Sequence, residues 1–253
     1  MIAFLRSVLH MAVMAATIVP LALLIVLAAA LGVGTHARYT LAKFWLALSI
    51  HAARGILGIE YRIQGLEHLP VGKTSPAILL VKHQSTYETF LMPAIMPHPL
   101  AYVFKRELLY VPFFGWAIGL LDMVHIDRSQ RAKAFAKVVE QGKVLLDKGV
   151  WVIMFPEGTR IPRGQRGVYK SGGARLAIAT GAPVIPIAVT SAKCWPRKAF
   201  IKYPGVVEVS IGAPIPSLGR EADELTQQVA QWIEAEMHRL DPQAYAEPPV
   251  TLV

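Results

Sequence analysis

The chain has 253 residues, of which 54% are apolar and only 17% are charged, and its formal net charge is +9. This length allows one large domain with an appendage, and the apolar excess is too high for an ordinary soluble domain. The single cysteine, Cys194, excludes an intrachain disulfide and indicates a reducing compartment. The positive charge favours anionic partners such as nucleic acid or an acidic lipid leaflet. No CxxC or HExxH spacing occurs, so we expect no metal site.

The first apolar run, residues 8–33, contains no Asp, Glu, Lys or Arg. A helix needs about 20 apolar residues to cross a bilayer, so this run is long enough to be a membrane anchor. Three interpretations are open. The run could be a cleaved signal peptide with Arg6 in its basic region and a cut site at residues 28–30, a helix that spans the bilayer, or a hairpin that enters one leaflet.

The next segment, residues 39–59, mixes aromatic, apolar and basic residues in an amphipathic pattern, which is typical of a helix at the membrane interface. A cleaved peptide followed directly by such a helix is the less natural arrangement. We therefore expect residues 1–59 to form a retained anchor and leave open whether it spans or re-enters. Basic residues flank both sides of the apolar run (Arg6, Arg38 and Lys43), so the positive-inside rule gives no orientation.

From residue 60 onward, short apolar runs alternate with helical patterns, which predicts an α/β domain whose mostly parallel sheet is flanked by helices. We place this domain at residues 60–240 and an irregular Pro-rich tail at residues 241–253. Pro186 lies inside one apolar run and predicts an edge or bulged strand there. The expected strands are residues 77–81, 100–104, 123–126, 150–155, 184–189 and 206–211, and the expected helices are residues 130–147, 172–180 and 224–240.

The stretch KHQSTYETF, residues 82–90, directly follows the first of these strands. Ser85 and Glu88 fit the capping box that begins many helices, in which the Glu side chain reaches back to the backbone of the cap. The capping box leaves His83 unexplained. In open α/β sheets, sites gather beyond the carboxyl ends of the strands, and His83 is at such a position.

A second motif, FPEGTR at residues 155–160, follows the strand at 150–155, and Lys105 and Arg106 follow the strand at 100–104. The order and spacing of these features, with His83 five residues before Glu88 and the Val184–Ile187 run downstream, resemble the lysophospholipid acyltransferase family that contains the 1-acylglycerol-3-phosphate acyltransferases. The resemblance covers roughly residues 61–214. One departure is that most of that family has Asp where this chain has Glu88.

The resemblance implies direct transfer of a fatty acyl group from acyl-CoA or acyl carrier protein to the free hydroxyl of a lysophospholipid, without an acyl-enzyme. The chemistry calls for a base that removes the hydroxyl proton as the oxygen attacks a thioester, and a neutral His serves near pH 7. We assign His83 as that base and Glu88 as the carboxylate that fixes its tautomer. Lysophosphatidic acid is the expected acceptor, and no cofactor is expected beyond the acyl donor.

Binding of the acceptor's phosphate calls for cations, and Arg160 can provide a bidentate fork. Glu157 could position Arg160 or bind the glycerol hydroxyl, and Gly158 would let the backbone approach closely. The full set of expected substrate-binding residues is Lys105, Arg106, Glu157, Gly158, Thr159, Arg160 and Lys170.

Other basic and acidic residues receive plainer interpretations. Asp127 and Arg128 are expected to be structural, as a carboxylate at a helix start and its salt bridge. Four bases (Arg131, Lys133, Lys137 and Lys143) favour a solvated or membrane-facing helix over a nucleic-acid patch, because no nucleic-acid motif accompanies them.

Alternative functions are acylation of another lysolipid, such as a lyso-ornithine lipid, and lipid binding without catalysis. We expect membrane association, with the catalytic domain on the cytoplasmic face of a bacterial inner membrane.

Overall fold

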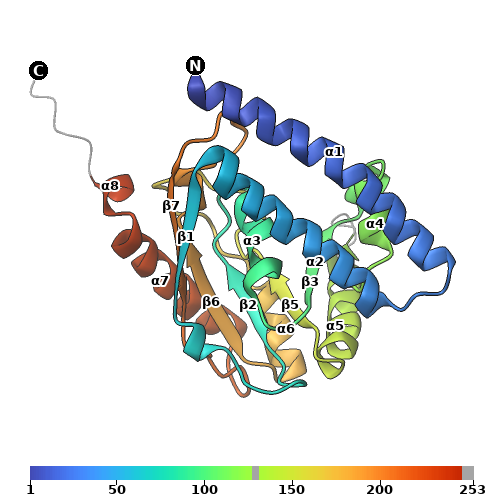
Figure 1. Cartoon of the computed structure of the whole chain (residues 1–253). Helices are drawn as coiled ribbons and strands as arrows, with labels where there is room; N and C mark the ends of the chain where they lie inside the picture. Colours follow the sequence, from blue (N-terminus) through green and yellow to red (C-terminus); the bar gives the residue numbers. More distant parts are fainter. Residues whose placement is uncertain (127–130, 247–253) are drawn as a thin grey trace, which may run out of the picture.

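The computed structural model describes residues 1–126 and 131–246, and it consists of one sheet with helices on both faces (Figure 1). The predicted α/β class with a mostly parallel sheet is confirmed. The strands are β1 Ile59–Gln64, β2 Ile78–Val81, β3 Leu100–Lys105, β4 Val124–Ile126, β5 Trp151–Met154, β6 Val184–Val189 and β7 Gly205–Ile211. The α-helices are α1 Ile2–Ala30, α2 Thr35–Ala52, α3 Tyr87–Ile95, α4 Phe114–Gly119, α5 Arg131–Asp147, α6 Gly172–Thr180, α7 Ala222–Leu240 and α8 Pro242–Tyr245.

The seven strands lie in the order β1-β7-β6-β2-β5-β3-β4. All neighbouring pairs are parallel except β6 and β7, which run antiparallel. The strands β6, β2, β5 and β3 are therefore parallel neighbours, and their carboxyl ends meet at one edge of the sheet. This edge is where the sequence motifs are brought together.

Pro186 lies in β6, which is bordered by β7 and β2 and is therefore an interior strand. The prediction of an edge strand at Pro186 is wrong. The paired register with β7 begins only at Ile187, opposite Ile211, and a separate bridge joins Val184 to Ile215. Between these two pairings, two residues of β6 (185 and 186) face three of the returning chain (212–214), which is a bulge. Proline lacks a backbone N–H to donate to a neighbouring strand. Because the pairing of β6 with β7 is interrupted at residue 186, no such hydrogen bond is needed there.

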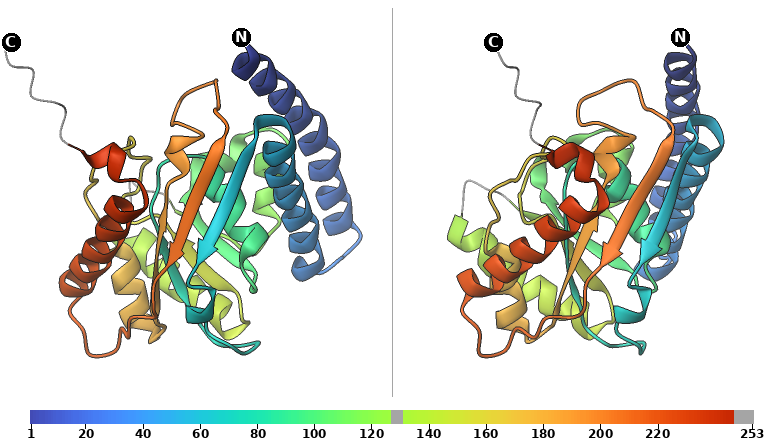
Figure 2. Two further views of the ribbon diagram at one scale, coloured as in Figure 1. Left: turned by 60° about the vertical axis from the view of Figure 1, so that its left-hand side comes forward. Right: turned by 90° about the vertical axis from the view of Figure 1, so that its left-hand side faces the viewer.

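Each face of the sheet is covered by its own set of helices, and the two faces carry separate cores (Figure 2). On one face, α2 and α3 pack on alternate strand residues such as Leu79 and Ile153. On the other face, α5, α6 and α7 pack on residues such as Ile78 and Val152. This alternation follows from the period of two in a strand, and it explains why the central strands read as continuous apolar runs.

The N-terminal helix α1 is the one helix among the described residues that is long and apolar enough to cross a membrane. It lies against α2 and α4 on the outside of the molecule, and α2 runs back beside it (Figures 1 and 2). The indole N–H of Trp45 on α2 donates to the Thr17 hydroxyl of α1 at 3.0 Å. Near the start of α1, the buried Ser7 hydroxyl accepts from the backbone N–H of Lys202 at 2.9 Å.

The segment expected to be an interfacial helix is α2, and it also contributes to the domain core. Ile50 of α2 and two residues of the following π-helical turn, Ala53–Leu57, are buried against the sheet. The tail expected to be irregular contains one helical turn, α8, so that expectation is wrong for residues 242–245. The expected role of Asp127 and Arg128, like the expected helix start at residue 130, lies outside the described residues.

Candidate active site

Four parallel strands deliver the polar residues of the site to the same edge of the sheet. β2 ends before Lys82 and His83, β5 before the FPEGTR turn, β3 at Lys105, and β6 before Thr190 and Ser191. The prediction that the sequence motifs lie beyond strand ends is confirmed by these positions. Residues more than 100 positions apart in the chain can therefore contact one another here.

The imidazole of His83 is held on one nitrogen and on one face. Its Nδ1 lies 2.9 Å from Glu88 Oε1, and its ring stacks on Phe155 with centroids 3.8 Å apart. The side chain is 13% exposed, while Glu88 is fully buried. With Nδ1 donating to a carboxylate, Nε2 is the nitrogen that can accept a proton.

Glu88 caps its helix and orients His83 at the same time. Its Oε1 accepts the backbone N–H groups of Gln84 and Ser85 at 2.8 and 2.7 Å in addition to His83 Nδ1. Its Oε2 accepts the hydroxyl of Ser191 at 2.6 Å. The two interpretations are therefore compatible, because a Glu at this position contacts the backbone and the imidazole together, and the orienting role in catalysis stays a prediction.

The hydroxyl of Ser85 forms a tighter variant of the expected cap. It accepts from the backbone N–H of Tyr87, two residues on, at 3.1 Å. The capping box predicts a bond to the residue three positions on. The helix α3 accordingly begins one residue late, at Tyr87.

Glu157 of the FPEGTR turn contacts the backbone of the His83 loop. It is buried, with Oε2 accepting the backbone N–H of His83 at 2.8 Å and Oε1 lying 2.7 Å from Lys82 Nζ. Burial raises the pKa of the Glu157 carboxyl, and the adjacent Lys82 ammonium acts against that rise. The geometry gives Glu157 contact with the backbone of His83 in place of the expected contact with Arg160 or the glycerol hydroxyl.

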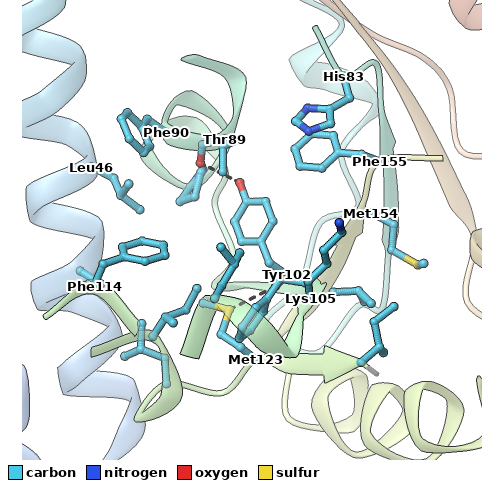
Figure 3. A pocket seen from close by; sticks show the side chains of 18 of the residues that line it. Leu46, His83, Thr89, Phe90, Tyr102, Lys105, Phe114, Met123, Met154 and Phe155 are labelled. Carbon is cyan, nitrogen blue, oxygen red and sulfur yellow. Dashed lines mark hydrogen bonds between the residues drawn. The ribbon is translucent and has the colours of Figure 1, made fainter. Parts of the chain in front are cut away.

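A cavity of about 920 Å³ opens beside His83 and extends between the sheet and the N-terminal helices. Figure 3 shows His83 and Phe155 on one side of it, Leu46 and Phe114 on the other, and Lys105 between them. Its walls away from His83 are mostly apolar and come from α1, α2, α3, α4 and β3. Such a space suits a ligand with a long apolar part and a compact polar head.

Four cations line this cavity, namely Lys105, Arg160, Lys170 and Arg175. Arg160 and Lys170 are the two that belong to or approach the FPEGTR turn beside the His83 loop. Arg160 Nε also donates to the backbone oxygen of Ser85 at 3.1 Å, which ties the FPEGTR turn to the His83 loop. Three of the expected residues do not line the cavity: Arg106 and Thr159 are exposed outside it, and Glu157 is buried.

The glycine of FPEGTR has a conformational role. Gly158 adopts φ of +67°, in the left-handed region that side chains disfavour. A Cβ there would also lie 3.0 Å from Lys170 Nζ, a tight contact that the end of the lysine side chain would have to relieve by a small shift at the cavity wall. Gly158 and Lys170 therefore both lie at the cavity, as expected from the sequence.

Several residues of the site were not found from the sequence. Arg175 lies on α6 and was not among the expected substrate-binding residues, and its guanidinium stacks 4.0 Å above Phe135. Ser191 carried no local signal and is identified only by its contact with Glu88. Lys82 could have been noticed as a lysine directly between a fully apolar strand and His83. Among the described residues, no group of three or more His, Cys, Asp or Glu could hold a metal ion.

Comparison with known proteins gives consistent results. A model of the "Acyltransferase" family matches residues 60–190. A 1-acyl-sn-glycerol-3-phosphate acyltransferase of Pseudomonas aeruginosa is 44% identical over 211 residues, covering 82% of this chain and 80% of that protein. The alpha form of the enzyme with the same name from Mus musculus is 30% identical over 71% of this chain and 63% of its own length.

The crystal structure of the 1-acyl-sn-glycerophosphate acyltransferase PlsC from Thermotoga maritima has the same fold. It matches with a TM-score of 0.76 and 24% sequence identity, and the match covers 94% of this chain and 95% of that one. The family model and the bacterial relative together show that this chain belongs to the acyltransferase family, the family to which its sequence motifs pointed.

Proposed function

We propose that this acyltransferase moves a fatty acyl group from a thioester donor to the free hydroxyl of 1-acyl-sn-glycerol 3-phosphate, giving phosphatidic acid. The observation that carries the proposal is the His83–Glu88 pair at a long apolar cavity that four cations line. The names of the relatives support the same acceptor. A lipid-binding protein without catalysis would not need a carboxylate-held imidazole in this place.

In the proposed reaction, Nε2 of His83 accepts the proton of the acceptor hydroxyl as its oxygen attacks the thioester carbonyl carbon. The C–O bond forms, the C–S bond breaks, and the imidazolium returns its proton to the leaving thiolate. Glu88 holds the Nδ1 proton throughout and stabilises the imidazolium, as in the serine-protease triad with the substrate's hydroxyl in place of Ser. The enzyme needs no nucleophile of its own.

The acceptor's phosphate is assigned to the cations that line the cavity, and its existing acyl chain to the apolar part. Arg160 can bind phosphate through two parallel N–H groups, while Lys105 and Lys170 act as point charges. Arg175 adds a fourth positive charge to this set. Acyl-CoA and acyl carrier protein present the same reactive thioester, and rates measured with each donor identify the preferred one.

An acceptor panel with one labelled acyl donor tests the proposal. Lysophosphatidic acid should give the highest kcat/KM, ahead of neutral lysolipids and lyso-ornithine lipid. A higher kcat/KM with lyso-ornithine lipid would assign the enzyme to that acceptor. Absence of transfer to every lysolipid by folded, membrane-bound protein would refute the enzyme assignment.

Arg160→Ala is expected to raise the KM for lysophosphatidic acid by roughly tenfold to 100-fold, the range of a lost charge-assisted hydrogen bond, while kcat changes less. A phosphate-free acceptor such as a monoacylglycerol should show no such rise in KM. The exposed Arg166, outside the cavity wall, provides the matched control as Arg166→Ala. An unchanged KM for lysophosphatidic acid would remove Arg160 from the phosphate site.

The protein is associated with a membrane, and we propose the bacterial inner membrane with the catalytic domain on its cytoplasmic face. The apolar α1 and the single cysteine support this placement.

Leu27 of α1 is 55% exposed, and Leu27→Asp should lower partitioning into anionic vesicles by about tenfold or more, since an Asp in a membrane helix is costly. Leu218→Asp, at an exposed leucine far along the chain, should leave vesicle partitioning unchanged. Equal partitioning of both variants would contradict membrane contact through this face of α1.

A further inference from the structure

A lysine is buried directly behind the catalytic histidine. Lys82 is 0% exposed, and its ammonium lies 2.7 Å from Glu157 Oε1 and 2.7 Å from Glu234 Oε1. The backbone oxygen of Gln165 lies 3.4 Å from the same nitrogen. The ammonium thus lies close to three oxygens, and two of them belong to carboxylates.

This cluster is connected to His83 through Glu157. One oxygen of the Glu157 carboxylate contacts Lys82, and the other accepts the backbone N–H of His83. Lys82 is also the residue next to His83 in the chain. A shift of the ammonium therefore changes the position of the His83 backbone by two routes, through the peptide bond and through Glu157.

The far partner of Lys82 lies on the C-terminal helix. Glu234 of α7 is 6% exposed, and its Oε1 accepts the Tyr169 hydroxyl at 2.8 Å as well as the Lys82 ammonium. Tyr169 precedes Lys170, which lines the cavity. Glu234 Oε1 thus contacts both Lys82 and Tyr169. Each of these residues directly precedes a residue that lines the cavity, His83 and Lys170 respectively.

A second tie between the end of α7 and the segment at residues 161–170 supports this arrangement. Arg163 Nε and Nη2 donate to the two carboxylate oxygens of Asp241, each at 2.7 Å. Gly164 approaches α8 so closely that a Cβ would meet the backbone oxygen of Ala244. The loop that follows FPEGTR is therefore fixed by the C-terminal part of the chain, which lies outside the residues matched by the family model.

We propose that Glu234 is a positioning residue for acyl transfer, which sets the backbone of His83 through Lys82 and Glu157. The inference rests on the proposed function. Apolar side chains of similar volume often stabilise a core as well as buried ion pairs do, so stability alone is a weak reason for three buried charges here. Fixing the base relative to a cavity-bound hydroxyl is a stronger one, since a displacement of about 1 Å can cost on the order of 100-fold in rate.

The test compares substitutions of Glu234 in the full chain, reconstituted in lipid. Glu234→Ala removes the acceptor for Lys82 and Tyr169, and it should lower kcat by about tenfold or more while the acceptor KM changes by less than about twofold. Glu234→Gln retains an oxygen that can accept from both partners, and it should recover most of the lost kcat. Glu236 lies on the same helix and forms an ion pair with the exposed Arg239. Glu236→Ala is therefore the matched control and should keep the wild-type kcat.

Rates are normalised to folded protein by circular dichroism, so that a loss of stability is not counted as a loss of rate. Glu234→Ala with a wild-type kcat and only a lower melting temperature would overturn the positioning role, as would a Gln variant as slow as the Ala variant. If Glu234→Ala does not fold, Glu234→Asp decides: withdrawing the carboxylate by one methylene should lower kcat several-fold, and an unchanged kcat overturns the proposal. All variants are assayed with whichever acceptor the wild type prefers in the panel, so a failure of lysophosphatidic acid as acceptor is distinguishable from a failure of this inference.

Discussion

His83→Ala is expected to lower kcat for acyl transfer by about 10²- to 10⁴-fold, the range that a positioned general base contributes. The imidazole lines the cavity, and Glu88 fixes Nδ1 so that Nε2 is the basic nitrogen. Alanine leaves the hydroxyl without a base and also removes the ring that stacks on Phe155. Transfer of a labelled acyl group under single-turnover conditions measures the chemical step directly.

The controls for this variant separate chemistry from folding. Vesicle binding and the circular dichroism spectrum of His83→Ala should match those of the wild type, because the ring is small and partly exposed. His125→Ala changes a histidine that lies within strand β4 and outside the cavity wall, where it contacts Lys137. It should retain the wild-type rate. A His83→Ala protein with wild-type turnover would exclude His83 as the base.

Glu88→Gln is expected to reduce kcat by about 100-fold or more while the acceptor KM changes little. The amide oxygen can still accept the backbone N–H groups of Gln84 and Ser85, so the start of α3 should survive. The negative charge that stabilises the imidazolium is lost, and the neutral amide holds the tautomer less firmly. Comparison of kcat with the melting temperature shows which function of Glu88 dominates.

Glu88→Asp should lie between the wild type and the Gln variant in rate. Aspartate keeps the charge but is shorter by one methylene. It must therefore give up one of the contacts that the fully buried Glu88 makes, among which is the hydrogen bond from Ser191. The expected cost is a lower melting temperature with a kcat above that of Glu88→Gln. If Glu88→Gln instead keeps its rate and loses only thermal stability, Glu88 serves the helix start alone.

The local part of the site could be predicted from the sequence because its residues are close in the chain. His83 and Glu88 are five positions apart, and FPEGTR is one continuous turn after an apolar strand, so strand ends and motif spacing were sufficient to find them. The helices were predicted for the same reason; α6 begins and ends where the sequence indicated, at residues 172 and 180. Hydrophobic periodicity determines such elements within a few residues of the chain.

The tertiary structure alone decided which distant side chains meet. The strand order places β2 between β5 and β6, which brings Glu157 to the His83 backbone and Ser191 to Glu88. The same order makes β6 an interior strand despite Pro186, because the chain of β7 bulges away at that point. Periodicity in a single sequence carries no information about which strand lies beside which.

The sequence by itself determined the α/β class, the apolar N-terminal helix, the acyltransferase motifs and the pairing of His83 with Glu88. The tertiary structure decided which cations line the cavity, moved Glu157 from the substrate to the backbone of His83, and placed Glu234 of α7 behind the catalytic loop. The physical reason is the range of the contacts. Caps, turns and strand ends are set by neighbouring residues, whereas the ion pair between Lys82 and Glu234 joins positions 152 residues apart, and it forms only after the sheet and α7 have packed together.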